Sequence, residues 1–299
     1  MPGGVFSFQG LSLERFNGVA MAVLSDEEEP NCSFYTTGVH VTGRSRWPRL
    51  AAALLVVTMT TALATEPPTV LITGANRGIG LELARAYAER GWNVIATARK
   101  PAEAASLKAI AAGHPRLVIE PLDVTSQRQI DALAARYAGK PVDVLINNAG
   151  ISGGHQNAKF GQLSAEVYQQ VHAVNVMGPV KMAEAFLPNI AASQQKKIIN
   201  ITSGQGSIGK TWGCCYIYRS SKAALNMMMR NISLELKPRG ITVGLISPGF
   251  VKTDFTPGLN LPMMITPEES AASVIKVIDG YDLSKTGTFL EHDGSEWPW

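Results

Sequence analysis

The feature of this sequence that most constrains its fold is the regular alternation of strand-like and helical segments from residue 69 onward. Short apolar runs that end at glycine or polar turns are typical of parallel strands buried on both faces. Segments with apolar residues at helical spacing lie between them. Strict alternation predicts a single-domain, doubly wound α/β fold with a mostly parallel seven-stranded sheet. The expected strands are Thr69–Thr73, Trp92–Thr97, Leu117–Pro121, Val142–Asn147, Lys197–Thr202, Ile241–Ile246 and Thr286–Leu290, and the expected helices are Gly78–Arg90, Ala102–Ala112, Ser126–Tyr137, 164–187, Tyr216–Leu236 and one that begins after Thr266.

The first 66 residues do not continue this alternation. Residues 1–45 show no sustained periodicity, and we expect them to form a disordered extension. Residues 46–66 resemble a secretory signal or a membrane-associated segment, because basic residues up to Arg49 precede the apolar run Leu50–Ala64. That run is shorter than the ~20 residues of a bilayer-spanning helix. We expect an exported or membrane-associated protein, with a cytoplasmic protein as the alternative, and a folded domain over 67–299.

Composition argues against several kinds of partner. A net charge of +3 with 17% charged residues gives no field strong enough to indicate nucleic acid or an anionic membrane. Three cysteines cannot form a disulfide framework, and neither they nor the five histidines have metal-ligand spacing. The neighbouring Cys214 and Cys215 are interpreted as small loop side chains rather than a redox pair. We therefore expect no nucleic-acid partner and no metal site.

A glycine-rich turn follows the first expected strand. Residues 73–80 have the sequence TGANRGIG and lead directly into a helix. Glycines there allow a tight turn and let backbone N–H groups approach a pyrophosphate, while the helix N-terminus supplies the positive end of its dipole. A purely structural turn would have a similar sequence. Because this one follows the first strand of an alternating sheet, it predicts a Rossmann-type dinucleotide site.

The end of the second expected strand indicates which dinucleotide binds. An NAD site usually has an acid there to hold the ribose 2′-hydroxyl, whereas Ala96–Lys100 contains none. Arg77 lies in the glycine turn, and Arg99 lies just after the strand. Guanidinium groups bind a 2′-phosphate through paired, charge-assisted hydrogen bonds. Arg99 could instead be a solvated loop residue, but the missing acid favours NADP(H) over NAD.

A tyrosine and a lysine one helical turn apart are the strongest catalytic candidates. Tyr218 and Lys222 are spaced i, i+4 and therefore share one helix face. A free tyrosine titrates near ~10, and a nearby lysine cation should lower that pKa toward the working range. Ser203 follows the fifth expected strand and can reach the same substrate oxygen from the sheet edge. Such a pair is usually solvated on a random helix, but its position after this strand indicates catalysis.

These motifs occur in the order typical of the short-chain dehydrogenase/reductase family, which the chain resembles over essentially all of 69–299. Within that family, the segment 218–226 and the ending 289–299 resemble C-factor and sniffer-type carbonyl reductases. The residues that carry the resemblance are TGANRGIG (73–80), Asp123-Val124, Asn147–Gly150, Asn175, Ser203, Tyr218 with Lys222, and Ser247–Thr253.

The resemblance implies a role for each matching residue. Tyr218 would be the general acid/base, and Ser203 would orient the substrate oxygen. Lys222 would hold the nicotinamide ribose, and Asn175 would anchor a water in the proton relay. The residues implied to bind NADP(H) are Gly74, Asn76, Arg77, Gly78, Ile79, Gly80, Arg99, Asp123, Val124, Asn148, Ala149, Gly150, Tyr218, Lys222, Pro248, Gly249, Val251 and Thr253.

One spacing departs from the family pattern. Ser203 precedes Tyr218 by two positions more than is usual, so Ser207 is the second choice for the substrate-orienting serine. We expect NADPH-dependent reduction of an aldehyde, ketone or quinone in a pocket formed by Ile151–Leu163, Gly204–Ile217 and Phe255–Ile265. The alternative is a non-enzymatic NADP(H)-binding signalling or regulatory protein. The resemblance also implies a homo-oligomer, a dimer or tetramer.

Overall fold

The computed structural model describes residues 11–16, 19–24, 66–154, 159–256, 258 and 260–299. The chain divides into two compact units, Met1–Ala62 and Leu63–Trp299, which are considered separately. The predicted signal-like segment 46–66 lies almost entirely outside the described residues. In the part of the chain that is described, no helix combines the length and apolar character needed to cross a membrane.

The N-terminal unit contains a β-hairpin, so the prediction that residues 1–45 lack regular structure is wrong for its two strands. Strands β1 (Leu11–Phe16) and β2 (Val19–Leu24) pair antiparallel, with Phe16 opposite Val19. The strands are separated in sequence by Asn-Gly, the dipeptide that favours a two-residue hairpin turn. That signal was available in the sequence, but β2 is apolar throughout and lacks the alternation that usually identifies a strand.

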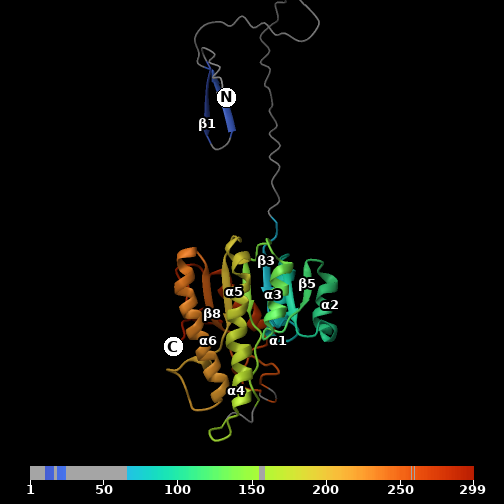
Figure 1. The fold of residues 1–299 in the computed structure, drawn as a ribbon, viewed down its shortest axis with the longest axis vertical. Coiled ribbons are helices and arrows are strands. Elements are labelled where there is room, and N and C mark those ends of the chain that lie inside the picture. Colours follow the sequence, from blue (N-terminus) through green and yellow to red (C-terminus); the bar gives the residue numbers. More distant parts are fainter. Residues whose placement is uncertain (1–10, 17–18, 25–65, 155–158, 257, 259) are drawn as a thin grey trace, which may run out of the picture. The chain divides into compact units, whose positions relative to one another are not determined.

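The second unit is built on a seven-stranded sheet in which every pairing is parallel, as expected (Figure 1). The strand order is β5-β4-β3-β6-β7-β8-β9, so the chain proceeds outward from β3 in one direction and then from β6 in the other. Ligands of such sheets bind where the order reverses, at the carboxyl ends of the central strands. The strands are β3 (Thr69–Ile72), β4 (Asn93–Ala98), β5 (Leu117–Pro121), β6 (Val144–Asn147), β7 (Lys197–Ile201), β8 (Thr242–Ser247) and β9 (Phe289–Glu291).

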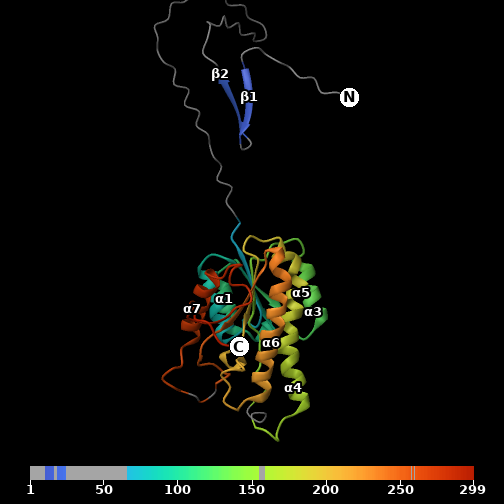
Figure 2. The ribbon, with the colours of Figure 1, turned by 90° about the vertical axis from the view of Figure 1, so that its left-hand side faces the viewer.

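Helices cover both faces of the sheet (Figure 2). One face packs against α1, α2 and α7, and the other packs against α3, α5 and α6. Every strand of this sheet except β5 contributes to both cores: in β3, Val70 and Ile72 face one core and Leu71 faces the other, whereas β5 contributes only to the first. The helices are α1 (Gly78–Glu89), α2 (Ala105–Gly113), α3 (Gln127–Arg136), α4 (Ala165–His172), α5 (Gly178–Ala191), α6 (Tyr216–Leu236) and α7 (Pro267–Asp279).

The main difference from the expected elements is in the helix predicted for 164–187. It forms as α4, a π-helical turn η3 (Ala173–Met177), and α5. Pro179 gives a physical reason, because proline has no N–H to donate to the carbonyl four residues earlier, which here belongs to Asn175. Single π turns inside α-helices often mark functional positions. The break therefore falls at a residue that the sequence already singled out.

Candidate active site

The glycine turn after β3 is joined by hydrogen bonds to the loop after β6, and both lie at the carboxyl edge of the central strands. The hydroxyl of Thr73 accepts hydrogen bonds from the backbone N–H groups of Asn148 and Ala149, each at 3.0 Å. The side-chain amide of Asn148 donates to the carbonyls of Thr73 and Gly74, at 2.9 and 3.1 Å. Four hydrogen bonds thus join two loops that lie more than seventy residues apart in sequence.

Two glycines of the turn are required by close packing. A methyl group added to Gly80 would lie 2.4 Å from both the Asn148 amide nitrogen and the Gly74 carbonyl oxygen. At Gly74, where φ is +68°, it would lie 2.9 Å from the Ala149 Cα. Gly78 is different. Its φ of +56° favours glycine, but a methyl group added there would come no closer than 3.5 Å to another atom, the methyl carbon of Thr253. The turn is therefore closely packed at Gly74 and Gly80, whereas there is space beside Gly78.

The structure brings the segments bearing Arg77 and Arg99 to the same place. The Ala75 N–H donates to the Thr97 carbonyl at 2.8 Å, which fixes the glycine turn beside the end of β4. The Arg77 guanidinium forms a 2.9 Å ion pair with Asp254, and both side chains are mostly exposed, at 65% and 71%. Arg99 is also exposed. An exposed ion pair contributes little to stability, so Arg77 can exchange Asp254 for another anion at low cost.

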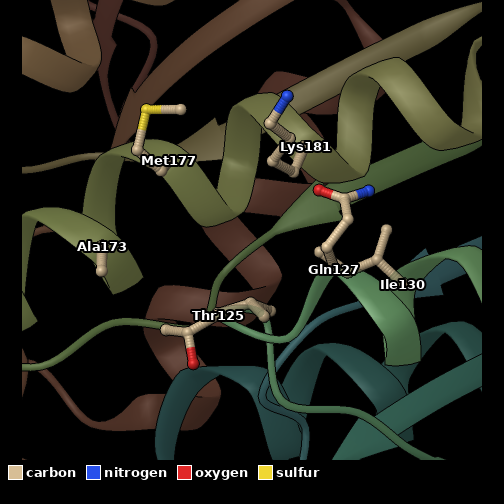
Figure 3. A pocket seen from close by; sticks show the side chains of 7 residues that line it. Thr125, Gln127, Ile130, Ala173, Met177 and Lys181 are labelled. Carbon is tan, nitrogen blue, oxygen red and sulfur yellow. The ribbon is translucent and has the colours of Figure 1, made fainter.

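Asp123 and Val124 follow β5, and Val124 borders a hollow of about 210 Å³ (Figure 3). The Asp123 carboxylate accepts hydrogen bonds from the backbone N–H and hydroxyl of Thr125, which tightens the loop. Val124 is buried, and its side chain packs against Gly178 at the start of α5, where an added methyl would lie 2.9 Å away. The hollow is lined by Val124, Thr125, Gln127, Ile130, Ala173, Met177 and Lys181.

Tyr218 and Lys222 face the carboxyl edge of the sheet from the first turns of α6. The Lys222 ammonium lies 5.8 Å from the centre of the Tyr218 ring and donates to the Ile201 carbonyl at 2.8 Å. Burial lowers the pKa of Lys222 to about 8. Burial also raises the pKa of Tyr218 to about 12, while a hydrogen bond with Ser203 lowers it and Cys215 raises it. The expectation that lysine dominates is therefore not met in the protein alone, because desolvation has the larger effect.

Ser203 lies beside Tyr218, whereas the Ser207 hydroxyl forms hydrogen bonds with other residues. Ser203 follows β7, shares a hydrogen bond with the Tyr218 side chain, and accepts from the Gln205 N–H at 3.1 Å. The Ser207 hydroxyl is buried, donates to the Trp299 carbonyl at 3.3 Å and accepts from the Lys210 N–H at 3.2 Å. The unusual spacing between Ser203 and Tyr218 is thus absorbed in the intervening loop, and the geometry favours Ser203.

Asn175 is buried in the π turn and ties three segments together. Its side-chain oxygen accepts from the Ile151 N–H at 2.9 Å, and its amide donates to the Ile151 carbonyl at 2.9 Å and to the Ser221 hydroxyl at 3.0 Å. Ser221 in turn donates to the Tyr218 carbonyl at 2.7 Å. The sequence did not single out Ser221, although its place between Tyr218 and Lys222 was a usable signal.

The segment after β8 lies across the glycine turn. The Thr253 methyl group lies near Gly78, since a methyl added to Gly78 would be 3.5 Å from it, and Val251 is buried. The Pro248 carbonyl accepts from the Ser270 hydroxyl at 2.6 Å. Gly249, with φ +85°, packs so closely on His292 that an added methyl would lie 2.7 Å from the imidazole. Pro248, Gly249, Val251 and Thr253 thus belong to a segment that lies at the carboxyl edge of the sheet, beside the glycine turn.

The expected substrate side is formed by loops with exposed apolar side chains. Phe160 and Tyr216 pack at 6.4 Å between ring centres, and Phe255 packs against Tyr218 at 6.1 Å. Trp212 lies over the Arg219 guanidinium at 4.2 Å. Within the described residues of these loops, the large apolar side chains that remain exposed are Phe160, Leu163, Ile208, Trp212, Tyr216, Phe255, Leu261 and Met263.

Comparisons with known proteins show which family and which solved structures the chain is similar to. The family model described as short chain dehydrogenase matches residues 68–263. The crystal structure of NADPH-bound carbonyl reductase from chicken fatty liver is 35% identical, with a TM-score of 0.73, covering 78% of this chain and 100% of that one. The carbonyl reductase Sniffer of D. melanogaster is 29% identical, with a TM-score of 0.72 and the same coverage. A Rhodococcus sp. (strain AD45) relative, 1-hydroxy-2-glutathionyl-2-methyl-3-butene dehydrogenase, is 37% identical over 77% of this chain and 99% of its own.

Proposed function

The chain belongs to the short chain dehydrogenase family, and from this membership we propose that it is an NADPH-dependent reductase of aldehydes, ketones or quinones. The observation that carries the proposal is the meeting of Ser203, Tyr218 and Lys222 at the carboxyl edge of the sheet. They lie where a doubly wound sheet binds its ligands. A protein that only bound the cofactor, the regulatory alternative, would have no need of Ser203 and Tyr218 together.

The turn after β3 fits a dinucleotide. An added methyl at Gly80 or Gly74 meets protein atoms, whereas one at Gly78 meets nothing closer than 3.5 Å, so Gly78 leaves room for a ligand to approach the backbone. That turn begins α1, whose positive dipole end favours phosphate. Gly78, Ile79 and Gly80 would hold the pyrophosphate, and Val124 would lie against the adenine.

The charges near the end of β4 support NADP(H) rather than NAD. Residues 96–100 contain no acid, and Arg99 is exposed at the point where the ribose 2′ position would lie. Arg77 reaches the same region, since the Ala75–Thr97 hydrogen bond joins the two segments. A 2′-phosphate would attract Arg77 away from Asp254, because that ion pair is exposed and weak.

The pKa of Tyr218 in the protein alone suits the proton donor that carbonyl reduction needs. At about 12, it keeps the phenol protonated at neutral pH, so Tyr218 can donate a proton to the substrate oxygen. Ser203 would donate a hydrogen bond to that oxygen and hold it at the phenol. When bound, NADPH supplies a hydride to the carbonyl carbon. Lys222 would hold the ribose and support the phenolate left after proton transfer.

The surroundings of Tyr218 support an apolar substrate. Phe255 contacts the Tyr218 ring, and Phe160 and Tyr216 pack together nearby in the loops. Large exposed apolar side chains that gather at one place often mark a binding surface. An aromatic or long-chain carbonyl would bury such side chains, whereas a small polar carbonyl would not.

The test is a panel of aromatic, aliphatic and polar aldehydes, ketones and quinones, assayed by loss of NADPH absorbance. We expect turnover with NADPH on the apolar members and much slower turnover with NADH. The reverse reaction, with the corresponding alcohol and NADP⁺, should also be measurable at alkaline pH. Tight NADPH binding without turnover on any member would contradict the enzyme and favour the regulatory alternative.

A further inference from the structure

The last residues of the chain fold back against the loop that bears Ser203. After β9, a tight turn at Asp293-Gly294 reverses the chain, with the Asp293 carboxylate accepting from the Ser295 N–H and hydroxyl. The Glu291 N–H donates to the Ser295 carbonyl, and the Trp297 N–H donates to the Phe289 carbonyl, each at 2.8 Å. Residues 292–299, called here the C-terminal tail, are thus fixed to the edge of the sheet.

Trp297 is held in one orientation by its neighbours. Its ring stacks on Phe289, with 6.2 Å between centres and 22° between planes, and its indole N–H donates to the Glu291 carboxylate. The Lys210 ammonium lies 5.2 Å from the ring centre. Trp297 is half-buried, and a packed aromatic ring whose N–H is paired is held in place.

The ring of Trp297 packs directly on Gly204, the residue after Ser203. A methyl group added to Gly204 would lie 2.7 Å from Cζ2 and 2.9 Å from Cη2 of the indole. From the other side, the Ser247 hydroxyl accepts from the Gly204 N–H at 3.0 Å. The turn that presents Ser203 is therefore held between the end of β8 and the tail.

The tail makes a second contact with the same loop, through Trp299. The Trp299 carbonyl accepts from the Gly209 N–H at 2.8 Å and from the Ser207 hydroxyl at 3.3 Å. This contact uses the backbone of Trp299, whereas the contact of Trp297 uses its side chain. Truncating the Trp297 side chain therefore removes one contact with the loop, whereas truncating the Trp299 side chain leaves the atom that makes the other.

We propose that Trp297 is a positioning residue, which holds Gly204 so that the Ser203 hydroxyl stays at Tyr218. This role rests on the proposed carbonyl reduction, since it acts through Ser203 and touches no reacting atom itself. A displacement of about 1 Å at a reacting group can cost up to about 10²-fold in rate, so a loose Ser203 turn would lower turnover substantially.

The first measurement does not depend on activity. Hydrogen exchange of the full chain, followed by mass spectrometry, compares Trp297→Ala with wild type in peptides covering 203–210 and 73–80. We expect faster exchange in 203–210 only, because the Gly206 N–H donates to the Ser203 carbonyl within the turn that Trp297 supports. Unchanged exchange in 203–210 would overturn the proposal, whether or not the chain reduces carbonyls.

The second measurement is a double-mutant cycle on kcat, since coupling between residues that act through each other is non-additive. Trp297→Ala should lower kcat about tenfold with the NADPH Kd unchanged, and Trp297→Phe should restore most of it. In a Ser203→Ala background, Trp297→Ala should cause no further loss. Equal losses in both backgrounds would mean a general structural role and would overturn the proposal.

Trp299→Ala is the matched control, because it keeps the backbone oxygen that contacts the loop and removes only the ring, whose centre lies 5.8 Å from that of Phe289. It should leave kcat within about twofold of wild type. If wild type reduces no carbonyl, the proposed function fails, and the exchange measurement still decides whether Trp297 holds the turn.

Discussion

The two sides of the proposed active site, the cofactor side and the substrate side, differ in how they are held. On the cofactor side, Thr73 and Asn148 join the two central loops by four hydrogen bonds, and Gly74 and Gly80 pack with no space for a methyl group. On the substrate side, Phe160, Ile208 and Met263 leave most of their side chains exposed, at 85%, 75% and 66%. The first side is fixed by hydrogen bonds between its own loops, whereas the second has apolar surface without a covering partner in the described residues.

This difference explains what each side can do. A fixed turn can bind the same phosphate groups in every catalytic cycle without being reordered, so little binding energy is lost to loop entropy. Loops with exposed apolar side chains can close on carbonyls of different shape. We infer that cofactor choice is strict and substrate choice is broad.

The substitution expected to disturb the cofactor side most is Gly80→Ala. The added methyl would lie 2.4 Å from the Asn148 amide nitrogen and from the Gly74 carbonyl, so the two loops must separate. Overpacking of this kind costs about 1–3 kcal/mol, and for a domain of this size roughly 2–4 °C of Tm per kcal/mol. We expect a lower Tm in a thermal melt and a loss of NADPH affinity by isothermal titration.

Gly113→Ala is the matched control, because a methyl there meets no atom within 4 Å. It should be neutral or stabilise by up to about 1 kcal/mol through helix propensity. Phe160→Ala, on the substrate side, should change stability by no more than about 0.5 kcal/mol. If Phe160→Ala lowered Tm as much as Gly80→Ala, the contrast between the two sides would be lost.

A smaller effect is expected from Arg99→Asp, which tests strict cofactor choice. The carboxylate would repel a 2′-phosphate and accept from a ribose 2′-hydroxyl. Losing a charged hydrogen bond of about 1.5–3 kcal/mol corresponds to roughly 10- to 100-fold in affinity. Kd values for NADPH and NADH should therefore move in opposite directions.

Arg239→Asp makes the same charge change on an exposed residue just before β8, at the amino edge of the sheet, and should leave the preference as it is. A cofactor preference that is the same in Arg99→Asp and wild type would contradict the assignment of Arg99.

The contrast also explains how much the sequence could predict. The bounds of β5 and α6 were predicted to the residue, and the glycine turn and Tyr218–Lys222 pair were found, because backbone geometry and helix spacing restrict which residues can stand there. The tail contact could not be predicted, since nothing local in 292–299 indicates that Trp297 packs on Gly204 from nearly a hundred residues away. The raised pKa of Tyr218 could not either, because desolvation depends on packing that spacing does not encode.

The measurement that tests the central claim most directly is single-turnover NADPH oxidation by Tyr218→Phe, with the best carbonyl from the panel. The substitution keeps the ring that packs on Phe255 and removes only the proton donor. We predict that the rate of the chemical step falls by about 10²–10⁴-fold, with the NADPH Kd unchanged and with Tyr168→Phe, on the exposed face of α4, retaining the wild-type rate. A Tyr218→Phe rate within a few-fold of wild type, when chemistry limits turnover, would contradict the account.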